Sequence, residues 1–363
     1  MATGVVVVYF SQLGGRLRTH QEVMLAADAK AIAGIKGYKF GGCYREDHSY
    51  SGPLFFVPDD TLLLDEALGL GIRGPADLYG GVVRYPFVKT KAITHPLVGS
   101  DAVRPEGWSN AFPERVRNIV LPGYTAFSPR DARIAAARML AQGPIRIKRP
   151  LGSEGKGQTV IASIEDLDPV LEGLSEEDVT TYGVVIEEDL QKVVTRSVGR
   201  IDFDGFTMSY HGKQRLTTDN QGRSVYGGSD LICVRGDWEA LGRLPLADEE
   251  RTAINQAKAY DDAMAAYPGF MASRKNYDVA AGIGNDGQRH CGVLESSWRV
   301  GGATGAEVLA ITQFLRDPSL QVIEAVHVEE FGDGRAPPKH AVVHFQGEDP
   351  RAGPVLRYTM VKQ

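Results

Sequence analysis

The stretch from Ile145 to Gln158 holds the residue types that bind phosphate groups. Its sequence, IRIKRPLGSEGKGQ, sets Lys148 at the end of an apolar strand and continues into a glycine-rich turn. Glycines leave consecutive backbone N–H groups free to close around phosphate oxygens, and a lysine adds a mobile positive charge. The turn contains three such glycines and a second lysine: Gly152, Gly155, Lys156 and Gly157. The same composition also describes a solvated hairpin turn, and its spacing is not that of a Walker A loop.

Two later segments add acidic and basic side chains at strand ends. An apolar strand that runs into Glu187 and Glu188 comes first. About a hundred residues later, the sequence ESSWRVGG follows a second apolar strand and contains Glu295, Ser297 and Arg299. The planar guanidinium of Arg299 can hold two oxygens of a phosphate or a carboxylate at once. The alternative role for Arg299 is a salt bridge to a neighbouring acid.

Taken in order, these segments resemble the ATP-grasp superfamily. In that family a strand lysine, a glycine-rich flap between antiparallel strands, an acidic hinge that holds adenine and a late strand reading roughly E-x-N-x-R-x-G-G follow one another. The corresponding positions here are Lys148, the turn 152–157, Glu187 with Glu188, and the segment 295–302. The resemblance covers roughly residues 120 to 315. At a finer level, the chain is similar to a proteobacterial group of ATP-grasp-like proteins.

The resemblance implies ATP and Mg²⁺ as cofactors and gives each basic residue a role. Lys148 and the flap would bind the phosphates, the acidic hinge would hold adenine, and Arg299 with Lys156 would stabilise charge on the transferring phosphoryl group. In the family a lysine from the region entering the nucleotide cleft often contacts the phosphates, and Lys91 could fill that place. Lys213 lies on a strand that could also face the cleft. Surface solvation is the competing interpretation for Lys91 and Lys213.

The candidate metal ligands are two acids and a serine. Mg²⁺ prefers hard oxygen ligands and keeps several waters, so a nucleotide site needs only one or two carboxylates. Glu295 is the leading candidate, and a hairpin at 284–287 would lay Asp278 beside it on the preceding antiparallel strand. Ser297 stands where the family usually has asparagine. Its hydroxyl could coordinate Mg²⁺ or hold a ligand water, but it offers no amide carbonyl, so a second metal position is in question.

Resemblance to the superfamily also implies a reaction: ATP-dependent activation of a carboxylate to an acyl phosphate, which an amine or similar nucleophile then attacks. The expected partners are therefore a small-molecule carboxylate and a small-molecule nucleophile. Two alternatives remain open. One is an ATP-grasp kinase that phosphorylates a small molecule, and the other is a non-catalytic nucleotide-binding regulatory protein, which the serine at 297 would suit.

Composition limits the other classes of function. A formal net charge of −6 argues against a general nucleic-acid binder, which would carry a basic stripe. No run of eighteen apolar residues occurs and the start has no signal-peptide pattern, so we expect a cytoplasmic protein that does not enter a membrane. Three scattered cysteines, Cys43, Cys233 and Cys291, form neither a disulfide framework nor a metal-binding pair, and we interpret them as reduced thiols.

The elements that must position these residues predict an α/β (α+β) fold of ATP-grasp type. With 363 residues and 43% hydrophobic content, the chain can bury a core of two or three domains. We expect an N-terminal α/β domain (1–118), a small α+β lid with the glycine-rich loop (119–190), and a C-terminal antiparallel-sheet domain with the metal site and a β tail (191–363). That tail could extend the sheet or form a homodimer contact.

Several local patterns give the expected elements. Ser128 is a good N-cap for an alanine-rich helix, and Ser163 opens another with the same logic. Period-two alternation predicts an antiparallel meander, and Tyr226-Gly-Gly-Ser-Asp230 indicates a loop that could line a pocket. The expected strands are 4–10, 54–57, 145–148, 159–162, 183–186, 195–201, 206–210, 213–217, 326–331 and 341–345, and the expected helices are 22–33, 59–70, 247–266 and one beginning at 303.

Overall fold

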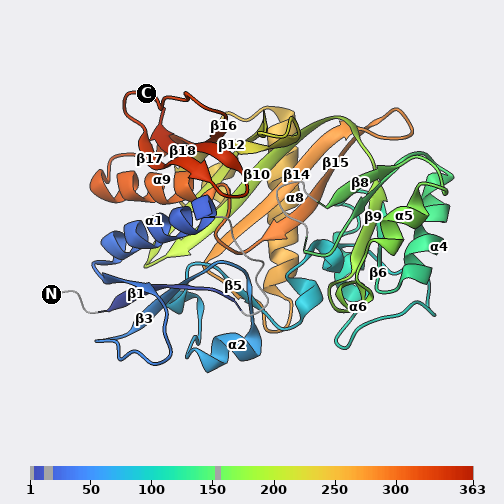
Figure 1. Ribbon diagram of the computed structural model, residues 1–363, viewed down its shortest axis with the longest axis horizontal. Helices are drawn as coiled ribbons and strands as arrows, with labels where there is room; N and C mark the ends of the chain where they lie inside the picture. The colour runs from blue at the N-terminus through green and yellow to red at the C-terminus, as the bar shows by residue number, and fades with distance from the viewer. Residues whose placement is uncertain (1–3, 12–18, 152–156, 363) are drawn as a thin grey trace.

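An eight-stranded sheet built from residues 191–361 lies at the centre of the protein (Figure 1). The computed structural model describes residues 4–11, 19–151 and 157–362. The strands of the central sheet are β10 (Gln191–Phe203), β11 (Phe206–Thr218), β12 (Ser224–Arg235), β14 (Arg274–Ile283), β15 (Arg289–Ser297), β16 (Val322–Phe331), β17 (Val342–Asp349) and β18 (Gly353–Val361). Their order is β15-β14-β10-β11-β12-β16-β18-β17, and all neighbours are antiparallel.

The N-terminal part is a parallel sheet followed by a smaller mixed sheet. The parallel sheet has the order β2-β1-β3, with β1 (Val5–Tyr9), β2 (Lys39–Cys43) and β3 (Leu54–Pro58). The smaller sheet consists of β4 (Leu62–Leu63), β5 (Gly81–Val83) and β13 (Met271–Ala272). The helices here are α1 (Thr19–Lys36), α2 (Leu64–Gly69) and α3 (Ala111–Val116), with the 3-10 turns η1 (Pro75–Asp77), η2 (Pro86–Val88) and η3 (Lys91–Thr94).

A four-stranded antiparallel sheet lies beside the β15 side of the central sheet (Figure 1). Its order is β6-β9-β7-β8, with β6 (Gly123–Ala126), β7 (Ile145–Lys148), β8 (Gln158–Ile161) and β9 (Val184–Glu188). Three helices accompany it: α4 (Pro129–Leu140), α5 (Leu167–Glu172) and α6 (Glu176–Tyr182). Helix α4 begins as the sequence predicts, because the hydroxyl of Ser128 accepts a hydrogen bond of 3.1 Å from the backbone N–H of Asp131.

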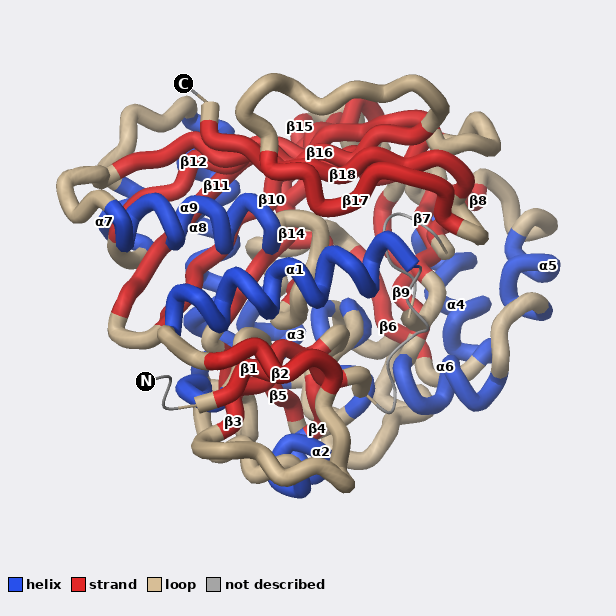
Figure 2. The backbone as a smooth tube through the Cα atoms, turned by 60° about the vertical axis from the view of Figure 1, so that its left-hand side comes forward, coloured by secondary structure: helices blue, strands red, loops and turns tan. Residues whose placement is uncertain are grey.

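The two faces of the central sheet are covered by different helices. The remaining helices are α7 (Trp238–Gly242), α8 (Asp248–Ala265) and α9 (Thr304–Arg316). One face packs Tyr277 and Val293 against α8, whereas the other packs Met208 and Tyr210 against α1 and α9. Figure 2 shows α1 lying between the N-terminal parallel sheet and the central sheet. Since successive side chains of a strand point to opposite faces, burial of both faces requires apolar residues at both odd- and even-numbered positions of the central strands.

The structure confirms most of the expected elements and corrects some. The predicted strands 206–210 and 213–217 are one continuous strand, β11, and the expected loop at 226–230 is part of β12. The helix expected to open at Ser163 begins only at Leu167. Strands β2, β4, β6, β13 and β18 were not predicted, and the helix expected over 59–70 is replaced by β4 and the shorter helix α2. The tail extends the central sheet, which was one of the two expected outcomes. The three cysteines are free thiols.

The proposed division at residues 118 and 190 falls between sheets along the chain. Residues 123–188 supply the four-stranded sheet, and residues 191–361 supply the eight-stranded one. Strand β13 crosses this division, since it pairs with β5 in the N-terminal part. We keep the three-part division as a proposal. None of the helices in the described part of the chain combines the length and the apolar composition that a membrane crossing requires.

Candidate active site

A cleft of about 580 Å³ opens between the four-stranded sheet, the central sheet and the N-terminal part. Strands β7 and β9 line one side, and β10, β14 and β15 form the floor. The loops at 59–61 and 89–91, helix α1 and the segment 299–303 complete the wall. Most of the residues predicted to bind the nucleotide and metal therefore meet in one cavity.

The floor of the cleft is a polar patch on one face of the central sheet. Asp278 on β14 stands opposite Glu295 on β15, and Asn276 stands opposite Ser297 in the same register. Ser197 on β10 pairs with Asp278 from the other side. Because residues two apart on a strand share a face, all five side chains belong to the same face of the sheet. The juxtaposition of Asp278 and Glu295 predicted from the hairpin is confirmed.

Neighbouring charges shift the pKa values of the two floor acids, Glu295 and Asp278, in opposite directions. Lys91 Nζ donates to Glu295 Oε2 at 2.6 Å. Burial by itself would raise the pKa of Glu295, but the positive charges of Lys91, Lys148 and Arg299 outweigh it and lower that pKa. For Asp278, burial and then the charge of Glu295 raise the pKa to about 6. Ser197 and Asn276 donate to its carboxyl at 3.2 and 3.0 Å.

Lys148 is held at the end of β7 by a buried ion pair. Its ammonium contacts the carboxylate of Glu187 on the neighbouring strand β9, and both side chains are almost completely buried. His95 Nε2 lies 3.4 Å from the other oxygen of Glu187. Burial would raise the pKa of Glu187, but Lys148 and His95 reverse the effect and bring it to about 2. The lysine is thus held in place in the wall of the cleft.

The acidic hinge uses its side chains for internal contacts. Glu187 is bound by Lys148, and Glu188 accepts from the backbone N–H of Asn285 and pairs with His290 Nδ1, both at 2.7 Å. These contacts tie the end of β9 to the hairpin between β14 and β15.

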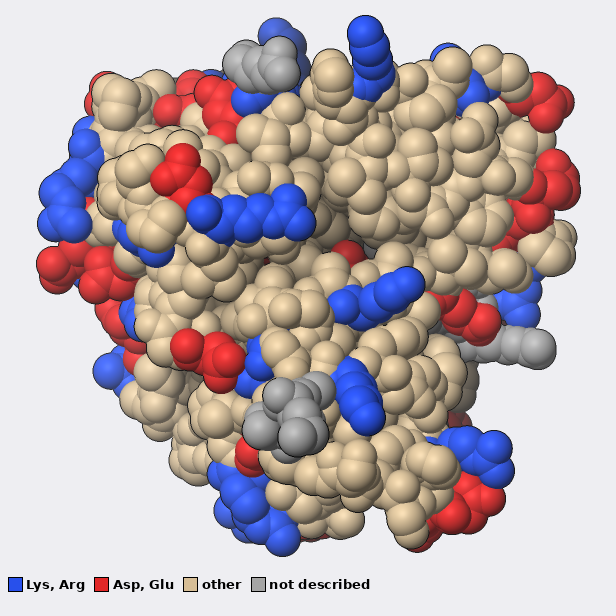
Figure 3. All heavy atoms as spheres, turned by 90° about the vertical axis from the view of Figure 1, so that its left-hand side faces the viewer, with Lys and Arg blue, Asp and Glu red and all other residues tan. Residues whose placement is uncertain are grey.

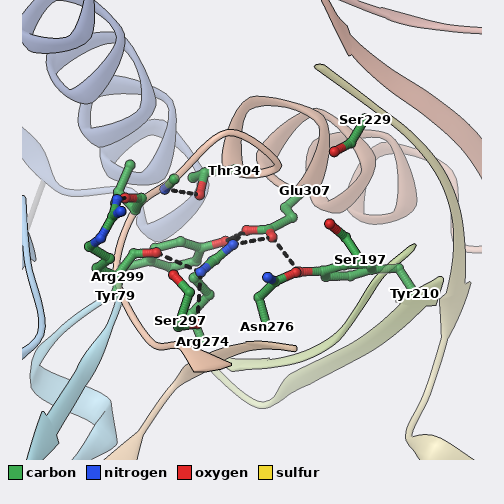
Figure 4. Close-up of polar contacts among 12 residues, drawn as sticks. Tyr79, Ser197, Tyr210, Ser229, Arg274, Asn276, Ser297, Arg299, Thr304 and Glu307 are labelled. Atoms are coloured by element: carbon green, nitrogen blue, oxygen red, sulfur yellow. Dashed lines mark hydrogen bonds and ion pairs between the residues drawn. The ribbon is translucent and has the colours of Figure 1, made fainter. Parts of the chain in front are cut away.

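Arg299 leaves the end of β15 on a backbone turn that a buried arginine holds in place (Figure 4). Arg274 Nη1 donates to the carbonyl oxygens of Ser297 and Arg299 at 3.1 and 2.5 Å. The other edge of this guanidinium makes a two-point contact with Glu307, at 2.9 and 2.7 Å, and Tyr79 and Tyr210 donate to the same carboxylate. This network fixes the turn that carries Arg299 and leads into α9.

Lys89, in the N-terminal part, is a further basic residue that faces the cleft. Lys89 Nζ donates to Asp60 Oδ2 at 2.5 Å, and the other oxygen of Asp60 lies 3.9 Å from Arg299 Nε. Lys89, Lys91 and Arg299 all line the cavity. The charge of Asp60 keeps Lys89 and Arg299 on the same wall, so an anion entering here meets several cations at once.

Some predicted residues lie elsewhere. Gly152, Gly155 and Lys156 lie outside the described residues. Gly157 has a φ of +78°, which favours glycine, and its carbonyl accepts from the backbone N–H of Arg149 at 2.8 Å, closing the base of the flap. Lys213 does not line the cavity. It is exposed, whereas the next residue on β11, Gln214, faces the cleft, so the expected role of Lys213 is withdrawn because alternation puts it on the opposite face.

Sequence reasoning missed several residues of the site. Asn276, Asp60 and Lys89 line the cleft, but each is one polar residue without a motif around it. Asn276 is two residues before Asp278 on the same strand, so the alternation of β14 could have identified it. Arg274 could not be found in this way, because its contacts join residues far apart in the sequence.

The floor residues have the chemistry that a magnesium ion requires. Asp278 and Glu295 offer carboxylate oxygens side by side, and Ser297 adds a hydroxyl on the same face. Among the described residues there is no cluster of three or more acidic, histidine or cysteine side chains that could enclose a metal. A pair of carboxylates with the remaining positions left for phosphate oxygens and water suits Mg²⁺, which seldom has an all-protein cage.

Solved structures with this arrangement of sheets define the class of the fold. N5-carboxyaminoimidazole synthetase from Staphylococcus aureus, complexed with ADP, matches with a TM-score of 0.57 and 12% identity over 100% of this chain and 94% of that one. Biotin carboxylase from Campylobacter jejuni matches with a TM-score of 0.52 and 11% identity over 98% and 87%. N5-carboxyaminoimidazole synthase from Aspergillus clavatus matches with a TM-score of 0.52 and 10% identity over 99% of this chain and 94% of that one. The chain has the ATP-grasp fold.

Within that fold, the chain belongs to the family described as "Protein of unknown function (DUF3182)", whose sequence profile matches residues 8–359. A search of curated proteins gave no match. The similarity to a proteobacterial group stays a prediction.

On the face shown in Figure 3, lysine and arginine side chains are interspersed with acidic ones, and the surface is hollowed near its middle, where acidic atoms are visible. This face carries no continuous basic stripe of the kind that tracks a nucleic-acid backbone. The expectations of no nucleic-acid partner and of a homodimer stay predictions.

Proposed function

We propose that this protein is an ATP-dependent ligase that activates a carboxylate as an acyl phosphate for attack by an amine or a similar nucleophile. A substrate carboxylate oxygen would bond to the γ-phosphorus of ATP as ADP leaves. The amine nitrogen would then bond to the acyl carbon as the carbon–oxygen bond to phosphate breaks, and the amine would release a proton. The products are an amide, ADP and inorganic phosphate.

One observation carries this proposal: Lys148, Lys91 and Arg299 line the same cleft as the paired acids Asp278 and Glu295. These residues come from three different parts of the chain, and the cleft lies on an ATP-grasp fold. Charge on a transferring phosphoryl group must be stabilised by groups that are already in position. The buried ion pair of Lys148 and the backbone clamp on Arg299 provide that preorganisation.

Magnesium would be held by Asp278 and Glu295, with the hydroxyl of Ser297 next to them. When bound, it would neutralise charge on the phosphate oxygens and hold them in register. Asn276 faces Ser297 across the two strands, so an amide is present beside the position where the family usually carries one. By resemblance to the family, the glycine-rich turn that contains Lys156 would bind the phosphates, and the hinge at 187–188 would hold adenine.

The solved relatives support nucleotide binding at this fold. The Staphylococcus aureus synthetase is described with ADP, and the Aspergillus clavatus enzyme with ADP and 5-aminoimidazole ribonucleotide. At 10–12% identity they carry no information on the substrate of this chain. ATP, Mg²⁺, a small carboxylate and a small amine are the partners we propose.

The test is an ADP-release screen in which pooled carboxylates are combined with pooled amines, with Mg²⁺ and ATP present. We expect one pair of pools to give ADP and a new acyl bond, and we expect Glu295→Ala and Lys156→Ala each to lower the rate at least a hundredfold. A phosphorylated acceptor without an acyl bond would identify a kinase instead. Unchanged turnover in both variants would overturn the site, and tight ATP binding without ADP formation would point to a regulatory protein.

A further inference from the structure

The cleft continues beyond the floor acids towards the last strands of the chain. His327 on β16 and Arg357 on β18 line it, together with Asp28 on α1 and Tyr226 on β12. Strand β16 lies four positions along the sheet from β14, which is roughly 19 Å at about 4.8 Å per strand. This end of the cleft, formed by Asp28, Tyr226, His327 and Arg357, is called the distal end below.

Arg357 and His327 are buried polar side chains with nitrogens that lack partners. Arg357 is 6% exposed and His327 is 1% exposed. Glu329 accepts from Nη2 of Arg357, but Nε of Arg357 and both ring nitrogens of His327 have no hydrogen-bond partner among the described residues. A guanidinium has five donors in a fixed fork. Buried donors are nearly always paired in folded proteins, so these atoms indicate a missing acceptor.

Four elements meet around the first turn of α9 to form this pocket. A side chain at Gly305 would lie 3.1 Å from His327 Nδ1, 2.8 Å from Thr359 on β18 and 3.5 Å from Met24 on α1. The glycine therefore lets helix, strands and α1 come together beside the imidazole. The segment 301–303, which precedes α9, lines the same cleft and ends at the positive pole of the helix.

Tyr226 connects the distal end to the floor acids. Its ring covers Gly302, where a side chain would lie 2.4 Å from the ring, and its hydroxyl hydrogen-bonds with Ser229 at 2.7 Å. Burial is the largest influence on the pKa of Tyr226 and raises it, and the charges of Asp278, Glu329 and Arg357 also act on this hydroxyl, so Tyr226 lies near both groups. A small molecule bound at the distal end would thus extend towards the metal site.

We infer that Arg357 and His327 form a substrate subsite that binds an oxyanion, either a carboxylate or a phosphate group carried by the molecule whose other end reacts at the floor acids. This inference rests on the proposed function. Glu329 binds Nη2 of the guanidinium and leaves Nε for the ligand, and the imidazole adds a donor from the adjacent strand. The paired charge of Glu329 makes this an orienting site with a fixed geometry rather than a general attractor of anions.

The test measures anion binding to the full-length protein saturated with Mg²⁺ and a nonhydrolysable ATP analogue, so that the nucleotide phosphate positions are filled. Inorganic phosphate and malonate are titrated separately by calorimetry. We expect one of them to bind, and we expect Arg357→Gln and His327→Gln each to weaken its Kd at least tenfold while leaving the Kd of the analogue unchanged. The preferred probe tells phosphate from carboxylate chemistry.

The matched control is Arg215→Gln. Arg215 lies on β11 of the same sheet and is ion-paired with Asp230, but it does not line the cleft. If Arg357→Gln does not fold, Arg357→Lys, which keeps the charge but loses the fork, and His327→Gln carry the test. Failure of both probes to bind the wild type, or equal affinity in wild type and variants, overturns the subsite. If the analogue fails to bind while an anion binds in an Arg357-dependent way, the proposed function fails and the subsite stands.

Discussion

The two ends of the cleft each bury a carboxyl group, with opposite results. Glu187 is 1% exposed and Asp28 is 3% exposed, and burial is the largest influence on the pKa of both. Yet the pKa of Glu187 falls to about 2, whereas that of Asp28 rises to about 8. Lys148 and His95 face the first carboxyl, while Glu307 adds negative charge beside the second and so adds to the effect of burial, against the opposing charges of Arg357 and Arg274. Burial alone would raise the pKa of both carboxyl groups, and the charges of the neighbouring side chains decide whether the final pKa lies below or above its ordinary value.

The end of the cleft that contains Lys148, Glu187 and the floor acids is called the proposed nucleotide end. Removing the positive charge of Lys148 there should have the largest effect on stability. Lys148→Met leaves Glu187 as a buried charge, and we expect the free energy of unfolding to fall by about 3–5 kcal/mol. Chemical denaturation at pH 7 measures it. The surface pair of Arg215 and Asp230 provides the control, since Arg215→Gln should cost less than about 1 kcal/mol.

Combining Lys148→Met with Glu187→Gln removes the buried carboxylate charge that has lost its lysine partner, so the double variant should regain part of the lost stability. Equal losses in Lys148→Met and Arg215→Gln would mean that the buried pair is no stronger than a surface one, and the contrast between the two ends would disappear.

At the distal end, the expected effect on stability depends on pH. The folded protein holds a proton on Asp28 that the unfolded chain releases, because its pKa rises from 3.8 to about 8. This contribution to stability is complete below about pH 4 and is lost as the pH rises towards 8. Asp28→Asn should remove the loss and raise the free energy of unfolding at pH 8, relative to wild type, by roughly 1–3 kcal/mol.

Urea denaturation of both proteins at pH 5 and pH 8 gives the comparison. Glu307, Arg357, Arg274 and Tyr79 interact electrostatically with Asp28, and none of them changes in the variant. A wild type and a variant that lose stability in parallel over this range would show that Asp28 titrates as an ordinary surface acid.

The smallest effect concerns the proposed metal site at the floor. Glu295→Gln removes one carboxylate charge, so we expect the affinity for ADP in the presence of Mg²⁺ to fall about tenfold, or about 1.4 kcal/mol. Calorimetry with Mg²⁺ and with EDTA separates the contributions, since chelation should weaken wild-type binding more than that of the variant. Glu324→Gln, an exposed acid on β16 outside the cleft, should leave binding unchanged. A variant as sensitive to EDTA as the wild type would remove Glu295 from the metal site.

The proposed nucleotide end could be predicted because its determinants are local. A hairpin fixes the register of its two strands, so Asp278 and Glu295 could be paired from the turn between them. No turn of this kind fixed the face of Lys213. It lies on the continuous strand β11, where Gln214 lines the cleft, so alternation places Lys213 on the opposite face.

The distal end could not be predicted, because its residues share no local pattern. Asp28 on α1 is about three hundred positions from His327 on β16 and Arg357 on β18, and it meets them only when α1 packs against the central sheet. The segment at 226–230 was interpreted as a loop for its glycines. In the structure, a side chain at Gly228 would lie 2.0 Å from the carbonyl oxygen of His327, so the glycine serves close strand pairing rather than a turn.

Strand β13 has a consequence for how the protein unfolds. It comes from the C-terminal half of the chain and pairs with β5, and Ser273 next to it donates its backbone N–H to the carbonyl oxygen of Gly80 at 2.9 Å. A fragment ending at residue 118 would lack this strand and expose an unpaired sheet edge, which promotes aggregation. The N-terminal part and the central sheet should therefore melt in a single cooperative transition, and an isolated N-terminal fragment should be recovered mainly as insoluble material.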